Sequence, residues 1–156
     1  MPKRSAGILL FKRESGALRV LLVHPGGPFW QKRDRGSWSI PKGEYVEGED
    51  ACAVALREFQ EETGVSAPAG DLIPLGEVRQ RGGKVVTAWA LEGDIDPEKI
   101  VSNTFEMVWP PKSGRHQTYP EIDRAAWFTL TEAREKILDG QRPLLERLAA
   151  AIGKGS

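Results

Sequence analysis

The sequence is poor in cysteine, because Cys52 is the only one among 156 residues. A single cysteine cannot form an intramolecular disulfide, so a reducing, cytoplasmic setting is expected. Long apolar runs are also missing, and none approaches the roughly 18 residues that a membrane-spanning helix requires. The apolar run at 6–11 follows a basic terminus but is too short for a secretory signal. We therefore expect no membrane partner.

An excess of charge of one sign is also absent, because 22 Lys and Arg balance 22 Asp and Glu. A balanced chain has no general electrostatic attraction to DNA, so no DNA partner is expected and any anion must be bound by local features. Histidine is scarce as well. His24 and His116 are too isolated in the sequence to predict a zinc site.

The chain has the length and composition of one globular domain. With 156 residues, 40% of them hydrophobic and 28% charged, it can bury one core but not two. It contains no internal repeat, low-complexity tract or linker. We expect residues 1–156 to form a single domain, as a monomer or a homodimer.

Apolar patterns and turn residues divide the chain into strands, helices and long loops. Strands are expected at 6–11, 18–23, 73–81, 84–91, 104–109 and 125–128. Helices are expected at 49–63, at 131–138 with Thr131 as its cap, and at 143–152. The remaining long segments, 24–37, 92–102 and 110–120, are predicted to be loops, and long loops in a compact domain are often functional.

The predicted helix at 49–63 has two distinct flanks. At 100° per residue, one flank gathers apolar side chains, which predicts a core stripe of Cys52, Ala55, Leu56 and Phe59. The other flank gathers Glu58, Glu61 and Glu62, which stand at i, i+3 and i+4. Taken alone, these three glutamates are equally compatible with an ordinary solvated acidic face.

The frame around the glutamates separates these two interpretations. It runs from Gly43 to Glu49, then to Arg57-Glu58-Phe59, Glu61-Glu62 and Gly64-Val65. This spacing is similar to the signature of the Nudix hydrolases, and seven such positions would match by chance on the order of once in 10⁸ to 10⁹ trials. Only Phe59 departs from it, because the family more often has an aliphatic residue there. The resemblance, which is to MutT-like proteins, implies an α/β (α+β) Nudix fold, a mixed β-sheet between α-helices.

The resemblance also implies an activity and a metal. Nudix hydrolases cleave a nucleoside diphosphate linked to another group X, giving a nucleoside monophosphate and phosphorylated X. The metal would be Mg²⁺, with Mn²⁺ as a possible substitute, because hard cations prefer carboxylate and carbonyl oxygens. By resemblance, the ligands would be Glu58, Glu61, Glu62 and the Gly43 carbonyl, while Arg57 would pair with Glu49 and orient the cluster.

A general base must take a proton from the attacking water. The family places this base either within the glutamate cluster or on a later loop. Glu121, which follows Tyr119-Pro120, is the candidate for the later position, and Glu106 is a less favoured alternative. An exposed loop carboxylate without a role is the competing interpretation of Glu121.

Four residues are candidates for contacts with a small-molecule nucleotide substrate. Lys42 adjoins the motif, Arg35 is one of several cations in the loop at 24–37, and Trp30 and Tyr119 are loop aromatics that could stack on a base. Trp38 and Trp127 stand in apolar segments and are expected to be structural. The Trp-Ser-Ile-Pro-Lys-Gly run at 38–43 resembles diadenosine polyphosphate hydrolases, while nucleoside triphosphates, dinucleotide cofactors, nucleotide sugars and capped RNA remain open.

Two other functions are compatible with such a resemblance. A non-catalytic nucleotide-binding module predicts a damaged glutamate cluster, whereas this cluster is intact. An isomerase of the same superfamily, acting on an allylic diphosphate, needs a catalytic cysteine outside the motif, whereas Cys52 lies inside the predicted helix.

Overall fold

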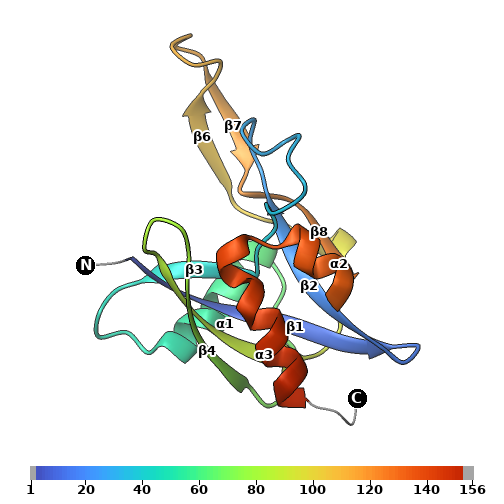
Figure 1. Cartoon of the computed structure of the whole chain (residues 1–156). Helices are drawn as coiled ribbons and strands as arrows, with labels where there is room; N and C mark the ends of the chain where they lie inside the picture. The colour runs from blue at the N-terminus through green and yellow to red at the C-terminus, as the bar shows by residue number, and fades with distance from the viewer. Residues whose placement is uncertain (1–2, 153–156) are drawn as a thin grey trace.

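A computed structural model describes residues 3–152. Its main element is a six-stranded mixed sheet, in which the strand order is β4-β5-β1-β2-β8 and β3 pairs with β1 (Figure 1). The strands are β1 (Arg4–Glu14), β2 (Ala17–Pro25), β3 (Lys42–Tyr45), β4 (Ile73–Arg79), β5 (Val85–Glu92), β6 (Thr104–Val108), β7 (His116–Pro120) and β8 (Ile122–Thr129). The helices are α1 (Ala51–Thr63), α2 (Leu130–Lys136) and α3 (Arg142–Ile152), with short 3₁₀ turns η1 (Pro97–Lys99) and η2 (Asp139–Gln141).

Strand β1 is central because it pairs with three strands. It runs parallel to β5, and its other edge is shared between β3, which pairs with residues 4–7, and β2, which pairs with residues 11–14. Successive side chains of a strand point to opposite faces, so a fully apolar strand must be covered on both. The apolar run at 8–11 is therefore a sheet interior, buried on each side.

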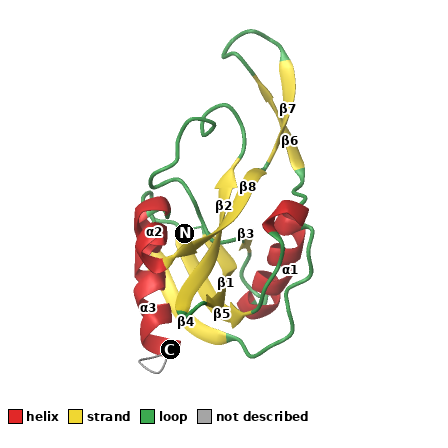
Figure 2. Ribbon diagram, turned by 90° about the vertical axis from the view of Figure 1, so that its right-hand side faces the viewer, coloured by secondary structure: helices red, strands yellow, loops and turns green. Residues whose placement is uncertain are grey.

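Two apolar cores cover the two faces of the sheet, and Figure 2 shows α1 on one side and α2 with α3 on the other. Leu9 and Phe11 of β1 pack in the core that includes Leu144, Leu145 and Leu148 of α3. Ile8 and Leu10 pack in the second core, with Val54, Ala55 and Phe59 of α1. The predicted fold class is confirmed. No helix in the described part of the chain is long and apolar enough to cross a membrane.

Helix α1 begins two residues later than predicted. Asp50 caps it, since its side chain accepts a hydrogen bond from the Ala53 amide at 3.2 Å, and Glu49 lies before it. The helix ends at Gly64, which adopts a left-handed conformation with φ 73° that few other residues tolerate. The predicted core stripe is partly wrong, because Val54, Ala55 and Phe59 are buried while Cys52 and Leu56 are only half-buried.

Two further expectations are corrected by the structure. Helix α2 is capped by Thr129 rather than Thr131, because Thr129 and Glu132 exchange side-chain and backbone hydrogen bonds in a capping box. The predicted loop at 110–120 contains strand β7, which pairs with β6 as a hairpin that projects from the body (Figure 1). We call this β6–β7 hairpin the arm.

Candidate active site

The carboxylate cluster, Glu58, Glu61 and Glu62, lies at the C-terminal half of α1, beside β3. Strand β3 places Gly43 directly against the helix, and a Cβ atom at Gly43 would fall 2.1 Å from Cδ of Glu58. Only glycine leaves this space for the carboxylate. The glycine at the first position of the motif is therefore explained by a close approach of the Glu58 side chain to the strand backbone.

Glu62 is held against the same strand. Its Oε2 atom accepts a hydrogen bond from the backbone amide of Lys42 at 3.1 Å. Burial raises the pKa of Glu62 to about 7, and the charges of Glu58 and Glu121 add to this increase. Burial, followed by the charge of Glu61, also raises the pKa of Glu58. The negative charges of Glu58 and Glu62 are therefore close together at a place where little water screens their repulsion. A bound cation would reduce this repulsion.

Arg57 connects two of the predicted site residues. Its Nη1 atom lies 3.3 Å from Oε2 of Glu49, and its Nε atom lies 4.0 Å from Oε1 of Glu61. Glu49 also accepts a hydrogen bond from the Val46 amide at 2.9 Å. That bond and Arg57 lower the pKa of Glu49. The segment before α1 is therefore tied to the exposed edge of the cluster.

Of the two candidate bases, Glu121 is the one whose charge acts on the cluster. Its charge contributes to the raised pKa of both Glu58 and Glu62. Its backbone is fixed on both sides, because its amide donates to the Asn103 carbonyl at 2.8 Å and its carbonyl accepts from Gly26 at 2.9 Å. Glu106 instead projects from the arm beside His116, with Oε1 and Nδ1 3.7 Å apart.

The donor set suits a hard cation, although its side chains do not form a closed site. Among residues 3–152, no three acidic, histidine or cysteine side chains converge closely enough to surround a metal ion. Glu58 and Glu62 lie against β3, while Glu61 turns toward Arg57. Carboxylate and carbonyl oxygens are the ligands that Mg²⁺ prefers, so these residues fit the metal by the chemistry of their donor atoms.

Comparison with known proteins identifies the family. The model of the NUDIX domain matches residues 1–148 of the chain. The chain belongs to the Nudix family. The resemblance in the motif is therefore confirmed over nearly the whole length of the sequence.

Curated relatives and solved structures show how far this Nudix domain can be compared. An octanoyltransferase of Myxococcus xanthus is 28% identical over 96% of this chain and 37% of that protein. An 8-oxo-(d)GTP phosphatase of Mycolicibacterium smegmatis is 39% identical over 47% of this chain and 23% of that protein. The chain thus spans less than two-fifths of these relatives. The C. elegans Ap4A hydrolase structure, at 22% identity, covers 95% of this chain and 97% of its own with a TM-score of 0.65, which shows a shared fold.

The predicted substrate contacts do not all lie together in this Nudix domain. Trp30 and Arg35 line a surface pocket of about 650 Å³ between the loop at 26–36, the β4–β5 turn and the start of α3. Lys42, by contrast, is half-buried beside the cluster, and burial lowers its pKa. Tyr119 lies on the arm, where its hydroxyl donates to Gln117 at 3.1 Å and its ring packs against Phe105.

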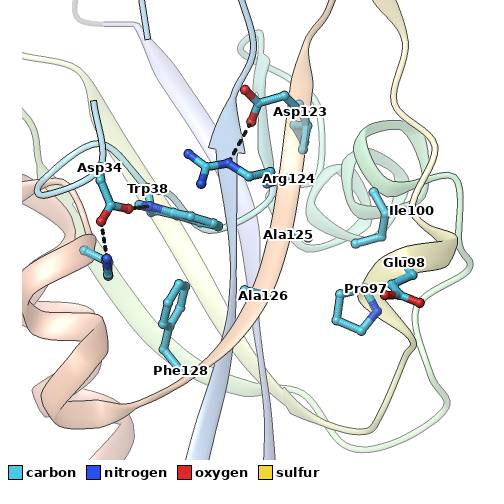
Figure 3. Close-up of a pocket in the computed structure, with 12 residues that line it drawn as sticks. Asp34, Trp38, Pro97, Glu98, Ile100, Asp123, Arg124, Ala125, Ala126 and Phe128 are labelled. Carbon is cyan, nitrogen blue, oxygen red and sulfur yellow. Dashed lines mark hydrogen bonds and ion pairs between the residues drawn. The ribbon is translucent and has the colours of Figure 1, made fainter. Parts of the chain in front are cut away.

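A second pocket, of about 620 Å³, runs along β8 and contains none of the predicted site residues (Figure 3). Trp38 borders it as a structural residue. Its Nε1 atom donates to Asp34 at 2.8 Å, and its ring contacts Phe128 edge-on at 5.0 Å. Hydrogen bonds from Lys136 and Trp38 lower the pKa of Asp34. The prediction that Trp38 is structural is confirmed.

His24 has a role that sequence reasoning missed. It is fully buried, with Nδ1 2.8 Å from Oδ1 of Asp123 and Nε2 2.5 Å from the Arg33 carbonyl oxygen. Both ring nitrogens therefore have a polar partner within the protein. His24 therefore ties the loop at 26–36 to β8. No local signal could reveal this, since Asp123 is 99 residues away.

Proposed function

We propose that this chain is a Mg²⁺-dependent pyrophosphohydrolase that cleaves a nucleoside diphosphate linked to another group X. The products would be a nucleoside monophosphate and phosphorylated X. The observation that supports this most is the packing of Glu58 and Glu62 against Gly43 and Lys42. The charge of Glu121 acts on both carboxylates and helps to raise the pKa of each. A diphosphate is heavily anionic, so its hydrolysis requires a site where cations can be concentrated.

In this proposal Glu58, Glu61, Glu62 and the Gly43 carbonyl hold the metal, and Mn²⁺ can substitute for it. When bound, the metal would neutralise negative charge on the phosphate oxygens and would make the phosphorus easier to attack. Arg57, held by Glu49, keeps Glu61 oriented toward the site. These residues are the ones that the motif predicts.

Glu121 acts as the general base. It takes one proton from a water molecule whose oxygen attacks one phosphorus of the diphosphate in line. The bond from that phosphorus to the bridging oxygen breaks, and the bridging oxygen leaves with the other phosphate. Glu61 and Glu62 are the other proposed catalytic residues, because their negative carboxylates would balance the positive charge of the metal.

Lys42, Arg35, Trp30 and Tyr119 are the proposed substrate contacts. Lys42 lies closest to the cluster and would neutralise a phosphate oxygen there. Trp30 and Tyr119 offer ring faces on which any nucleobase can stack. Dinucleoside polyphosphates and nucleoside triphosphates are the favoured substrates, because both combine a base with more than one phosphate, and the relatives include an 8-oxo-(d)GTP phosphatase.

The proposal is tested by incubating the protein with Mg²⁺ and a panel of nucleotide diphosphates in ¹⁸O-labelled water. Mass spectrometry of the products should find the label in one phosphate product, which locates the attacked phosphorus. Glu62→Gln should lower kcat/KM by at least about 100-fold. Glu106→Gln, a matched substitution on the arm, serves as the control. Full turnover by Glu62→Gln, or no hydrolysis of any substrate by the unaltered protein, overturns the proposal.

A further inference from the structure

The segment 38–42, which leads into β3, has a hydrogen-bond partner for each of its backbone amides. Pro41 has no amide. Three of the others donate to oxygen atoms nearby: Trp38 to the Lys136 carbonyl at 2.9 Å, Ser39 to the Val23 carbonyl at 2.9 Å, and Lys42 to Glu62 at 3.1 Å. The last belongs to Ile40, which is fully buried. It donates to Oε1 of Gln141 at 3.0 Å, so a side chain distant in sequence takes the place of a neighbouring strand.

Gln141 is fully buried, and both donors of its side-chain amide are paired. While Oε1 accepts from Ile40, Nε2 donates to Oγ of Ser39 at 2.9 Å and to Oε1 of Gln80 at 2.8 Å. The Ile40 amide can only donate, which determines that the oxygen of the Gln141 side chain faces it. A buried polar network whose donors are all paired holds its members in one arrangement.

The turn that carries Gln141 is itself fixed against β4. In η2, a Cβ atom at Gly140 would fall 2.7 Å from Cα of Gln80, so a larger residue would push η2 away from the end of the strand. The backbone amide of Gln141 also donates to the Leu138 carbonyl at 2.9 Å. Gln141 therefore holds the segment 38–42 from a fixed position.

Strand β1 contacts the same segment at the next residue. The Ile8 amide donates to the Pro41 carbonyl at 3.1 Å, and a Cβ atom at Gly7 would fall 2.5 Å from that carbonyl oxygen. The segment therefore lies directly against the backbone of β1. Because Gln141 holds Ile40 and β1 holds Pro41, the chain has little freedom to shift before it enters β3.

The residues that follow are the ones that meet the carboxylate cluster. The Lys42 amide donates to Glu62, and Gly43 lies so close to Glu58 that a Cβ atom there would fall 2.1 Å from Cδ. An extended chain advances about 3.3 Å per residue, so only about 10 Å of chain separates Ile40 from Gly43. A shift of Ile40 would therefore be passed on to the backbone that contacts both carboxylates.

We infer that Gln141 is a positioning residue of the carboxylate cluster. Through the Ile40 amide, it sets where the backbone of residues 42–43 lies relative to the glutamates. This inference rests on the proposed function, because that backbone matters for catalysis only if the cluster holds a metal. A glutamine with a purely structural role would stabilise the core without affecting the metal site in particular, and experiment can measure this difference.

Binding of Mn²⁺, followed by the electron paramagnetic resonance signal of the free ion, tests the metal site without turnover. Gln141→Met fills a similar space but cannot bond to the Ile40 amide. It should weaken Mn²⁺ binding by about tenfold or more, the range for residues that support metal ligands. Gln141→Glu keeps an oxygen for the Ile40 amide and should bind Mn²⁺ nearly as tightly as the unaltered protein. Leu148→Ala, in the same core as Ile40, is the control for a loss of stability alone.

Backbone amide signals in the ¹H–¹⁵N NMR spectrum of the metal-free protein provide a second measurement. In Gln141→Met, the signals of Lys42 and Gly43 should shift together with that of Ile40, whereas in Leu148→Ala they should move much less. Gln141→Asn, whose side chain is one methylene shorter, should shift the same signals, and it replaces Gln141→Met if that variant does not fold.

The outcomes separate this inference from the proposed function. If the unaltered protein neither binds Mn²⁺ nor hydrolyses any nucleotide, the proposed function fails, while the amide signals still decide whether Gln141 positions the strand. The inference is overturned if Gln141→Met and Leu148→Ala weaken Mn²⁺ binding equally, or if Gln141→Glu binds Mn²⁺ as weakly as Gln141→Met. It is also overturned if the signals of Lys42 and Gly43 are unchanged in Gln141→Met.

Discussion

The carboxylate cluster and the pocket beside Trp30, which four arginines border, are constructed differently. The cluster comes from β3 and α1, within twenty residues of sequence, with Glu121 added from the end of the arm. The pocket is assembled from the loop at 26–36, the β4–β5 turn, α2 and the region of η2 and α3. The proposed metal site is thus encoded locally, whereas the pocket, as a proposed site of substrate contacts, depends on tertiary structure. If this division is correct, substitutions in the cluster should affect all substrates alike.

The largest effect that tests this division is expected at Glu121. Replacing Glu121 with glutamine keeps the shape but removes the base, so kcat should fall by about 1,000-fold, within the range for general base catalysis. KM should change little, and the loss should be the same for diadenosine diphosphate and tetraphosphate. The measurement is steady-state kinetics on both substrates, with Glu106→Gln as the control. A loss that depends on chain length would place Glu121 in substrate selection instead.

A smaller loss is expected from Gly43→Ala. The added Cβ would lie 2.1 Å from Cδ of Glu58, so the carboxylate must move away. Because a misplacement of about 1 Å can cost about 100-fold in rate, kcat/KM should fall by about that factor. The flexible end of Glu58 is what yields, so the melting temperature should change little. Ala53→Gly in the exposed first turn of α1 is the control for a glycine–alanine change; unaltered kinetics in Gly43→Ala would contradict the packing.

The third prediction concerns the metal-free protein. Burial raises the pKa of Glu62 from 4.5 to about 7, so the folded state binds a proton more tightly than the unfolded state does. Stability from this group is fully present below pH 4.5 and is lost as pH rises through 7. With EDTA at pH 8, Glu62→Gln should therefore be more stable than the unaltered protein by about 3 kcal/mol.

Urea denaturation at pH 5 and pH 8 checks this expectation. The stabilisation should shrink at pH 5, where the glutamate is protonated in the folded state. Glu106→Gln should show no comparable difference between the two pH values. A Glu62→Gln variant that is less stable than the unaltered protein at pH 8 would show that the carboxylate is not strained by burial. The cluster would then resemble an ordinary solvated face.

The sequence predicted the cluster better than it predicted the pocket, for a physical reason. Helical spacing fixes the relative positions of Glu58, Glu61 and Glu62 within one α-helix, and the frame around them supplied Gly43. The motif could not predict that Arg81 and Arg142 line the pocket. No spacing rule connects residues of a turn and a helix that come together only in the folded chain. Arg35 and Trp30 were predicted to be loop residues that contact the substrate. The sequence did not show that they line the same pocket.

The errors in the fold have the same origin. Residues 116–120 were predicted to be a loop because they are mostly polar and show no strand pattern. They form strand β7 because they pair with β6, a contact that the local sequence does not reveal. The cap of α2 was predicted at Thr131, two residues too late, whereas Thr129 both ends β8 and caps the helix. Where the local sequence favours two conformations about equally, tertiary packing decides which of them forms.

The smallest expected effect lies at the boundary of the cluster, where Arg57 contacts Glu49 and Glu61. Lysine keeps the charge but has no planar group with which to reach both carboxylates. Since the arginine side chain is half exposed, the ion pairs themselves stabilise the fold little. The orientation of Glu61 should be affected more, so Arg57→Lys should weaken Mg²⁺ binding by about tenfold, as for other residues that orient metal ligands.

Calorimetric titration of Mg²⁺ with bound nucleotide measures this loss of affinity. Added Mg²⁺ should restore turnover to Arg57→Lys but not to Gly43→Ala. If high Mg²⁺ failed to rescue Arg57→Lys, Arg57 would have to contact the substrate directly, and the proposed division between a locally encoded metal site and a separate pocket for substrate contacts would no longer hold.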